Sequence, residues 1–324
     1  MAFPVIHSTL DPAALTAEIE RRYDFRDAIS CRLINRANND FYEIRAGDRC
    51  FALRVAKANF RTNDAYAYEL DLLTHLDRAG CRVPAPLKAR DGSTFFTVEA
   101  PEGIRAVAIF QWLSGRPFTK ALTAADAGEI GAALARLHLA GQSFQTSFRR
   151  LVNNADYVGQ HMPALADMLA KETVDRDFYL KAEGAVRAAY DRIAGDGLPT
   201  GQVHGDFQFA NVMREGDGTI AALDFDTCGE GYLAEDIFTF IWRSDMEIRD
   251  ERVNAAFING YETHRPLSAD ERRALPLFRA ARDLVMCTTY AILINRVGPL
   301  PGFDGDFGDF TRLARRHLSD AGLC

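Results

Sequence analysis

The spacing of apolar residues changes along the chain, from a strand-like period near the start to a helical period later. Short or alternating apolar runs predict strands around residues 31–33, 41–44, 50–55, 95–98 and 104–110. Asp11 and Pro12 mark the start of a short helix before the first strand. Thr62 or Asn63 caps a second helix, which has a stripe of leucines on one face.

From about residue 114 the pattern becomes mainly helical. Thr123 and Asp126 form a capping-box pattern at the start of one helix. Further helices are predicted over residues 162–170, 178–194, 233–243, 252–261 and 268–294, and a loop over residues 299–309. Strands gathered in the first third and helices in the remainder are typical of an α+β fold.

Polar residues with a recognisable chemistry cluster between Val203 and Asp226. His204-Gly205-Asp206 follows a short apolar run, and Asn211 comes five residues after Asp206. Two brief strands around a Glu-Gly-Asp-Gly turn then lead to Asp224. The simple alternative is a β-hairpin whose polar loop merely carries acids. The combination of His204-Gly205-Asp206, Asn211 at its fixed spacing and the Asp-Phe-Asp after the turn makes a chance occurrence less plausible than a functional site.

This pattern suits phosphoryl transfer. The reaction needs an oxygen that orients the attacking hydroxyl and oxygen ligands that hold magnesium on the phosphates. Magnesium binds a few carboxylate or amide oxygens and keeps several waters. Asp206 fits the first role, and Asn211 and Asp224 fit the second.

The motifs also carry a resemblance to known kinases. H-G-D-x-x-x-x-N resembles the catalytic loop H-R-D-x-x-x-x-N of protein kinases, and L-D-F-D occupies the place of D-F-G. With Gly in place of Arg, the chain looks more like the aminoglycoside phosphotransferase and choline kinase superfamily. The continuation D-F-D-T-C-G-E-G-Y-L-A-E-D-I is similar to its stress-response-kinase-like or homoserine-kinase-like branch.

The resemblance implies a protein-kinase-like fold of two lobes. Residues 1–113 would form a small antiparallel-sheet lobe that binds ATP, and residues 114–324 a larger, mainly helical lobe for catalysis and substrate. Asp206 would accept the proton of the acceptor hydroxyl, and His204 would fix the conformation of the catalytic loop. Asp226 would assist the metal or contact the substrate. Asp236 would accept backbone hydrogen bonds from the catalytic loop.

For the nucleotide, the resemblance points to residues of the first lobe. Arg54 stands where the family normally has a phosphate-binding Lys, with Lys57 as the alternative if the strand register shifts. Glu69 would pair with that basic residue. Asn39 lies in the loop expected over the phosphates. Backbone groups near Gln111 and Leu113 would hold adenine, with Trp112 packed nearby or in the core.

Aromatic residues surround the catalytic motif and admit two interpretations. Phe207 and Trp242 could form a platform for an amine-bearing substrate through cation–π attraction, or they could belong to the core.

Charge and composition narrow the partners. The net charge of −7 over 324 residues disfavours a nucleic-acid partner, whereas an acidic surface tolerates or attracts a cationic acceptor. The six cysteines form no C-x-x-C pair, which argues against zinc and favours a reducing compartment. No signal peptide is recognisable, and the most apolar stretch, residues 284–294, is too short to span a membrane. A cytoplasmic location is predicted.

We therefore expect an ATP- and Mg²⁺-dependent kinase that phosphorylates a hydroxyl of a small molecule, such as an amino alcohol, an amino acid or an aminoglycoside. A Ser/Thr protein kinase of the bacterial stress-response type and a nucleotide-binding pseudokinase are the alternatives. The sequence leaves open the identity of the acceptor, the choice between ATP and GTP, and the oligomeric state.

Overall fold

The structure, a computed structural model, describes residues 3–36, 39–170, 173–297 and 307–323. The chain divides into two compact units, each built from several segments. The first unit comprises residues 1–118, 139–150 and 210–229, and the second comprises residues 119–138, 151–209 and 230–324. Most of the predicted loop at residues 299–309, and residues 37 and 38 of the predicted phosphate loop, lie outside the described residues.

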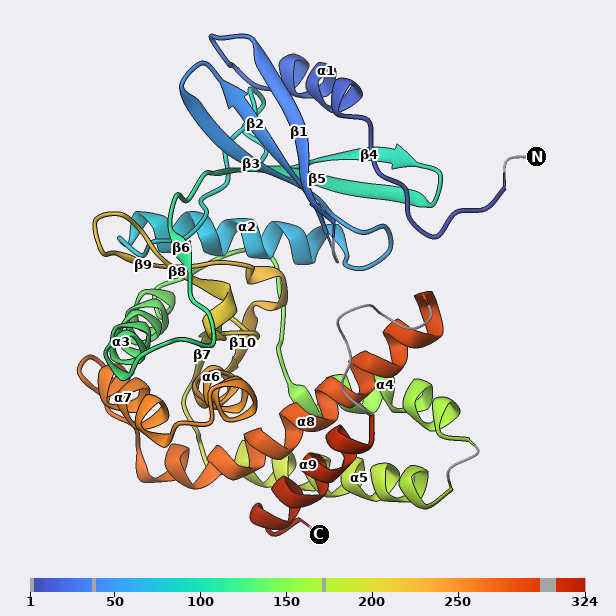
Figure 1. Cartoon of the computed structure of the whole chain (residues 1–324), viewed down its shortest axis with the longest axis vertical. Helices are drawn as coiled ribbons and strands as arrows, with labels where there is room; N and C mark the ends of the chain where they lie inside the picture. Colours follow the sequence, from blue (N-terminus) through green and yellow to red (C-terminus); the bar gives the residue numbers. More distant parts are fainter. Residues whose placement is uncertain (1–2, 37–38, 171–172, 298–306, 324) are drawn as a thin grey trace. The chain divides into compact units, whose positions relative to one another are not determined.

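The helices and strands follow the predicted order (Figure 1). The strands are β1 (Ile29–Arg36), β2 (Asp40–Ala46), β3 (Arg49–Val55), β4 (Phe96–Ala100), β5 (Gly103–Gln111), β6 (Arg116–Pro117), β7 (Thr200–Val203), β8 (Val212–Arg214), β9 (Ile220–Ala222) and β10 (Gly229–Tyr232). The helices are α1 (Pro12–Arg22), α2 (Asn63–Arg78), α3 (Ala124–Gly141), α4 (Asn154–Met168), α5 (Thr173–Gly195), α6 (Leu233–Glu247), α7 (Glu251–Glu262), α8 (Ala269–Val297) and α9 (Phe307–Asp320). Two 3₁₀ turns, η1 (Phe209–Asn211) and η2 (Phe225–Thr227), flank the β8–β9 hairpin.

A five-stranded antiparallel sheet forms the centre of the first unit, in the order β1-β2-β3-β5-β4. The alternation predicted along β3 is confirmed, because Leu53 and Val55 are fully buried in a core that also contains Leu15 and Ile19 of α1. Arg54 lies on the opposite face of the strand, where it contacts α2. Helices α1 and α2 therefore cover opposite faces of the sheet (Figure 1).

Both predicted helix starts in the first unit are confirmed. The Asp11 side chain accepts a hydrogen bond from the Ala13 N–H, and the Thr62 hydroxyl accepts one from the Ala65 N–H at 3.2 Å. Leu70, Leu73 and Leu76 form the buried stripe of α2.

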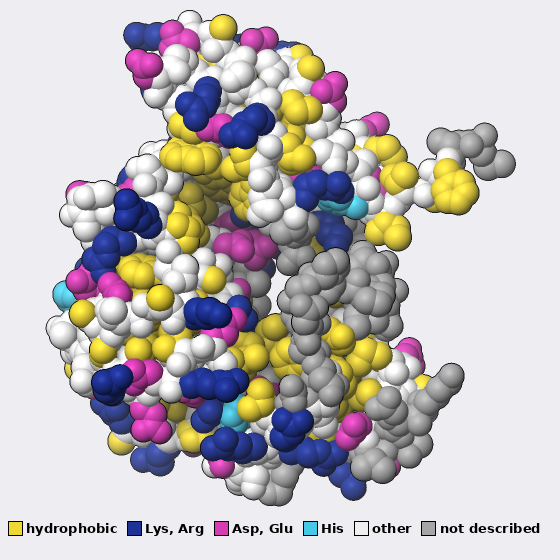
Figure 2. All heavy atoms as spheres, viewed as in Figure 1, with side chains coloured by type: hydrophobic (Ala, Val, Ile, Leu, Met, Phe, Trp, Pro, Cys, Tyr) yellow, Lys and Arg dark blue, Asp and Glu magenta, His cyan; other side chains and the backbone are white. Residues whose placement is uncertain are grey.

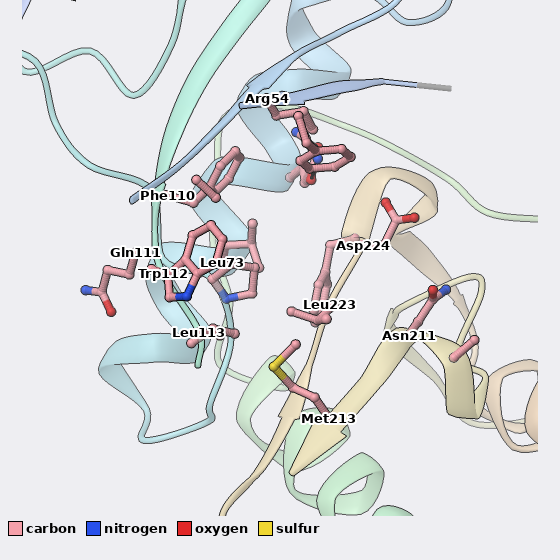
Figure 3. Close-up of a pocket in the computed structure, with 16 residues that line it drawn as sticks. Arg54, Leu73, Phe110, Gln111, Trp112, Leu113, Asn211, Met213, Leu223 and Asp224 are labelled. Carbon is pink, nitrogen blue, oxygen red and sulfur yellow. Dashed lines mark hydrogen bonds and ion pairs between the residues drawn. The ribbon is translucent and has the colours of Figure 1, made fainter. Parts of the chain in front are cut away.

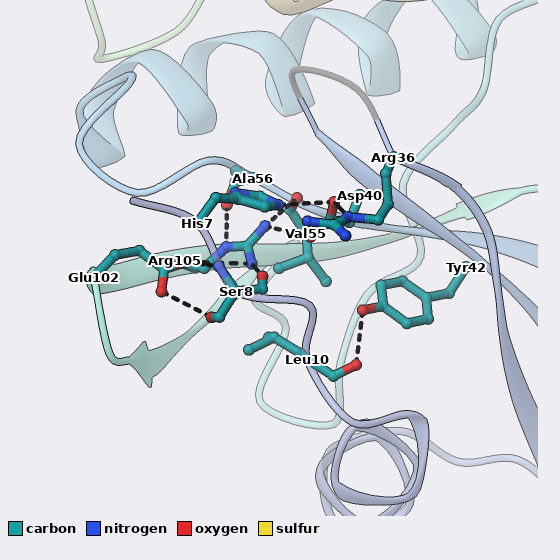
Figure 4. A network of polar contacts seen from close by, with 10 residues as sticks. All are labelled: His7, Ser8, Leu10, Arg36, Asp40, Tyr42, Val55, Ala56, Glu102 and Arg105. Carbon is teal, nitrogen blue, oxygen red and sulfur yellow. Dashed lines mark hydrogen bonds and ion pairs between the residues drawn. The ribbon is translucent and has the colours of Figure 1, made fainter. Parts of the chain in front are cut away.

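A buried polar network ties the N-terminal segment to this sheet (Figure 4). Arg105 of β5 is fully buried and donates to the Asp40 carboxylate at 2.8 Å and to the carbonyl oxygens of Ala56 and Ser8. His7 contacts the other oxygen of Asp40 at 3.0 Å, and Glu102 accepts from Ser8. The network satisfies the buried guanidinium and fixes the first residue of β2, directly after Asn39.

The second unit is mainly helical. In it α8 packs against α4, α5, α6 and α9, and the short strands β7 and β10 pair beside the catalytic motif. Helix α4 begins at Asn154, eight residues before the predicted start, because Asn153 caps it with bonds to the N–H groups of Ala155 and Asp156. On the face drawn in Figure 2, basic and acidic side chains are interspersed over this unit, in keeping with surface ion pairs such as Arg272–Glu262 and Arg279–Asp245.

The predicted boundary between residues 113 and 114 stays a prediction. It was placed by chain order, whereas the two compact units interleave along the chain, and the β8–β9 hairpin groups with the sheet of the first unit. No described helix has both the length and the apolar character that crossing a membrane requires.

Candidate functional site

A pocket of about 330 Å³ lies within the first unit, with an apolar end and a polar end (Figure 3). Leu73, Phe110, Met213 and Leu223 belong to the apolar part, and Arg54, Asn211 and Asp224 belong to the polar part. Sequence reasoning predicted the polar residues separately, from β3, η1 and the end of β9, and the structure brings them to one cavity. An apolar slot that ends in charged and amide groups is suited to a flat ring joined to an anion.

The predicted pair of Arg54 and Glu69 is confirmed as a contact. Two guanidinium nitrogens of Arg54 donate to the two carboxylate oxygens of Glu69 at 2.7 and 2.8 Å, and both side chains are buried. Burial acts to raise the pKa of Glu69, but the charges of Arg54 and Arg61 outweigh it and hold that pKa at about 2. Arg54 is thereby fixed at the pocket wall with donors left for a phosphate.

Arg61 is a member of this cluster that sequence reasoning missed. Its guanidinium contacts Glu69 at 2.8 Å, lies 4.1 Å from the centre of the Tyr66 ring, and donates to the backbone carbonyl of Asp226 at 2.7 Å. Arg150 donates to the same carbonyl at 2.6 Å. Arg61 therefore links the buried Glu69 to the turn that carries the metal-binding candidate. An arginine shortly before a helix that contains a buried Glu was the available signal.

The turn at Asp224 has a strained backbone. Asp224 adopts the left-handed conformation, with φ 61° and ψ 62°, just before η2. A non-glycine residue held in this region is typical of a functional position, and Asp is among the residues that tolerate it. Its side chain is exposed into the pocket, and the backbone of the neighbouring Leu223 donates to the Asn211 carbonyl at 2.8 Å.

The donor set at this end of the pocket fits magnesium. Among the described residues, no group of three His, Cys, Asp or Glu side chains could form an all-protein metal cage. Magnesium in nucleotide sites is held by one or two carboxylates together with phosphates and waters, so Asp224 and the amide oxygen of Asn211 are an adequate protein share.

Asn39 and Asp226 lie together in the first unit. The amide nitrogen of Asn39 donates to the Asp226 carboxylate at 3.4 Å, and Asn39 is nearly fully buried. This contact places Asn39 beside the turn that follows Asp224. The predicted role of Asn39 in phosphate binding and that of Asp226 in metal or substrate binding stay predictions.

The segment predicted to hold adenine lines the apolar end of the pocket. Gln111, Trp112 and Leu113 all contribute to its wall, and the Gln111 side chain points away from the cavity (Figure 3). The backbone N–H of Gln111 donates to the Ala85 carbonyl at 2.9 Å, so that donor is already engaged. A contact of Gln111 with adenine would therefore use its carbonyl oxygen.

His204, Gly205 and Asp206 of the predicted catalytic motif lie in the second unit, where Asp236 fixes their loop. This buried carboxylate accepts hydrogen bonds from the N–H groups of His204 at 2.6 Å and Gly205 at 2.8 Å, as predicted. His138 binds it at 3.1 Å. Burial acts to raise the pKa of Asp236, but these bonds and charges lower it overall. The ring of His204 accepts from the Asp206 N–H at 3.3 Å, which agrees with a role in loop conformation.

Asp206 itself is held by two side chains of the second unit. Arg282 of α8 donates to one carboxylate oxygen, and Gln208 donates to the other at 3.2 Å. Sequence reasoning missed Arg282. The available signal was the charged Arg282-Asp283 pair directly before the apolar stretch of residues 284–294, because charges that are buried require partners.

The two aromatic residues proposed as a substrate platform are core residues. Phe207 is fully buried, with its ring edge-on to His204 and near Phe257. Trp242 is 3% exposed, and the guanidinium of Arg282 lies 5.6 Å from the centre of its ring. This burial agrees with the core interpretation of both residues, and the cation near the Trp242 ring is Arg282 of the protein itself.

Comparison with known proteins places these features in context. The model of the phosphotransferase enzyme family matches residues 30–277. A homoserine kinase of Mesorhizobium japonicum is 31% identical over 237 residues, which cover 69% of this chain and 66% of the relative.

Two solved structures show the same fold. A microcompartment-associated aminopropanol kinase aligns over 96% of this chain and 99% of its own, with a TM-score of 0.71 and 22% identity. An amicoumacin kinase, solved with AMP-PNP and Ca²⁺, aligns over 97% of this chain and 95% of its own, with a TM-score of 0.74 and 16% identity.

Proposed function

Because this chain belongs to the phosphotransferase enzyme family, we propose that it transfers the γ-phosphoryl group of ATP to a hydroxyl of a small molecule. The chain has the mixed fold of kinases, with an antiparallel sheet and a helical part. The observation that carries the proposal is the polar end of the pocket, where the Arg54–Glu69 pair, Asn211 and the strained Asp224 line one cavity beside an apolar slot.

The residues of the first unit have nucleotide-binding roles in this proposal. The apolar wall around Phe110, Met213 and Leu223 would receive the adenine ring. Arg54 would bind the phosphates, because Glu69 fixes its guanidinium while further N–H donors remain. Asp224 and Asn211 would hold Mg²⁺, which neutralises phosphate charge when bound.

Asp206 carries the acceptor chemistry. It would accept the hydroxyl proton as the acceptor oxygen bonds to the γ-phosphorus and the bond from that phosphorus to the bridging oxygen of ADP breaks. Proton transfer is late in such loose transition states, so the carboxylate works mainly by orienting the hydroxyl. The Asp236 bonds to His204 and Gly205 support this role by fixing the loop.

The cationic acceptor predicted from net charge gains no support from Asp245 and Glu247, two acidic residues of α6 that follow the catalytic motif in sequence. Asp245 is paired with Arg279 at 2.9 Å, and Glu247 with Arg243 at 2.5 Å, so both acids already have counter-charges. The names of similar proteins, an aminopropanol kinase and a homoserine kinase, support small hydroxyl acceptors that carry an amine. The predicted cytoplasmic location stays a prediction.

The test is a coupled assay for ADP release with Mg²⁺ and a panel of amino alcohols, hydroxy amino acids, sugars and aminoglycosides. The proposal predicts turnover with at least one acceptor, and GTP in place of ATP tests the nucleotide. Purified protein that binds nucleotide but phosphorylates no member of the panel would favour the pseudokinase alternative. Phosphorylation of a protein substrate alone would favour the protein-kinase alternative.

A further inference from the structure

Both carboxylate oxygens of Asp206 are engaged within the second unit. A terminal nitrogen of Arg282 donates to Oδ1, and the amide nitrogen of Gln208 donates to Oδ2 at 3.2 Å. An acceptor hydroxyl that donates to Asp206 has to replace or share one of these bonds. The chemistry of Arg282 and Gln208 therefore bears on which acceptors the protein can use.

Arg282 and Gln208 each carry a further buried polar atom that has no hydrogen-bond partner among the described residues. The side chain of Arg282 is anchored over Trp242, is 9% exposed, and also donates to the Gly205 carbonyl at 3.3 Å. Within the part of the chain that the structure describes, its Nε is buried without a hydrogen-bond partner, and so is the Oε1 of Gln208. Buried polar atoms without partners are rare and costly, and they commonly mark a place where a ligand or water binds.

The two unpartnered atoms have complementary chemistry. Arg282 offers a cationic donor of the type that binds carboxylates in a fork, and Gln208 offers a neutral oxygen that can accept from an ammonium group. Both side chains contact the carboxylate that would orient the acceptor hydroxyl. A ligand bound there would therefore carry an anion, a hydrogen-bond donor and a hydroxyl within a few bonds of one another.

We infer that the acceptor is a hydroxy amino acid whose carboxylate binds Arg282 and whose ammonium group binds Gln208. The inference rests on the proposed kinase function and names its substrate class. When the acceptor binds, Arg282 donates to the carboxylate of the acceptor in place of the Asp206 carboxylate. The released oxygen of Asp206 then accepts a hydrogen bond from the acceptor hydroxyl. An amino alcohol offers no anion in exchange, so it would break the Arg282–Asp206 bond without replacement.

Pairs of compounds that differ only in the carboxylate test the inference. L-Serine with ethanolamine, L-homoserine with 3-aminopropan-1-ol, and L-threonine with 1-aminopropan-2-ol would be titrated calorimetrically into the full chain with AMP-PNP and Mg²⁺. The tightest-binding acid should bind about 10- to 100-fold more tightly than its decarboxylated partner, the range expected for a hydrogen-bonded charge.

Variants of Arg282 test whether this residue causes the preference for the acid over its decarboxylated partner. Arg282→Met should abolish it, and Arg282→Lys should keep part of it, because a single ammonium replaces a fork. Arg279→Met is the matched control, since Arg279 is also ion-paired on α8 but contacts Asp245, and it should keep the preference. Circular dichroism would check folding, and Arg282→Lys alone would be read if the Met variant unfolds.

Three results would overturn the inference: no acid binds, amines bind as tightly as their acids, or the preference for the acid survives in Arg282→Met or stays undiminished in Arg282→Lys. Efficient phosphorylation of amino alcohols without any preference for acids would refute this inference and leave the proposed kinase function intact. Absence of phosphoryl transfer to every acceptor, with amino acid binding retained, would instead refute the kinase function.

Discussion

Replacing Glu69 with Gln should destabilise the first unit by about 3–5 kcal/mol, the usual cost of removing one partner of a buried ion pair. Glu69 is fully buried, and its two oxygens hold Arg54 at 2.7 Å and Arg61 at 2.8 Å. Gln keeps the shape of the side chain but loses its charge and one acceptor. Both guanidinium groups then remain buried without that counter-charge.

The lowered pKa of Glu69 provides a second route to the magnitude. Since one pKa unit is worth somewhat more than about 1 kcal/mol, a lowering of the pKa from 4.5 to about 2 corresponds to about 3 kcal/mol. Because the folded pKa is depressed, this stability is present above the unfolded pKa of 4.5 and is lost as pH falls through about 2. The stability deficit of Glu69→Gln should therefore be about 1 kcal/mol smaller at pH 3.5 than at pH 7.

Urea unfolding followed by circular dichroism at both pH values measures this effect. Glu18→Gln is the matched control, because Glu18 also binds two arginines, Arg21 and Arg22, but does so on the partly exposed surface of α1. Such a pair contributes under about 1 kcal/mol. The reasoning is refuted if Glu69→Gln loses no more stability than Glu18→Gln, or if its deficit is unchanged at pH 3.5.

Three further predictions concern other groups. Asp224→Ala should abolish turnover while nucleotide binding survives more weakly, and full activity with Mg²⁺ present would contradict the metal assignment. Arg54→Ala should raise the KM for ATP or lower kcat, and Arg54→Lys should restore only part of the activity. If Lys57→Ala lowers activity and Arg54→Ala does not, Lys57 rather than Arg54 binds the phosphates. Burial raises the pKa of Glu235 to about 8, so the protonated side chain is the form that favours the folded state. This contribution to stability is fully present below pH 4.5, the usual pKa of the group, and it is lost as pH rises through about 8. Glu235→Gln should remove this loss, and melting temperatures at pH 6 and 8.5 that fall equally in both proteins would contradict the prediction.

Local patterns in the sequence were sufficient to predict most helices and strands and to single out the motif around Asp206. Asp11 and Thr62 mark helix starts through side-chain bonds to nearby N–H groups, and the alternation in β3 separates Arg54 from Leu53. These features depend on neighbours in the chain, so residue order reveals them.

Features that depend on distant partners could not be predicted in the same way. The partners of Asp206 include Arg282, which is 76 residues away on α8, and the carbonyl of Asp226 receives Arg61 from 165 residues away. The aromatic character of Trp242 suggested a cation–π contact, but only the fold shows that the cation is Arg282. Periodicity indicates which face of a helix is buried, and it does not indicate what that face meets.

The catalytic role of Asp206 is the central claim, and kcat of Asp206→Asn on an accepted acceptor tests it most directly. Asn keeps the size of the side chain but removes the base and its charge. The account predicts that kcat falls by about 10²–10⁴-fold, the usual contribution of such a group, while ATP affinity and the melting curve change little. Loss of less than about threefold, against that range, would contradict the assignment of Asp206 as the base, and an unfolded variant would show that the residue serves structure instead.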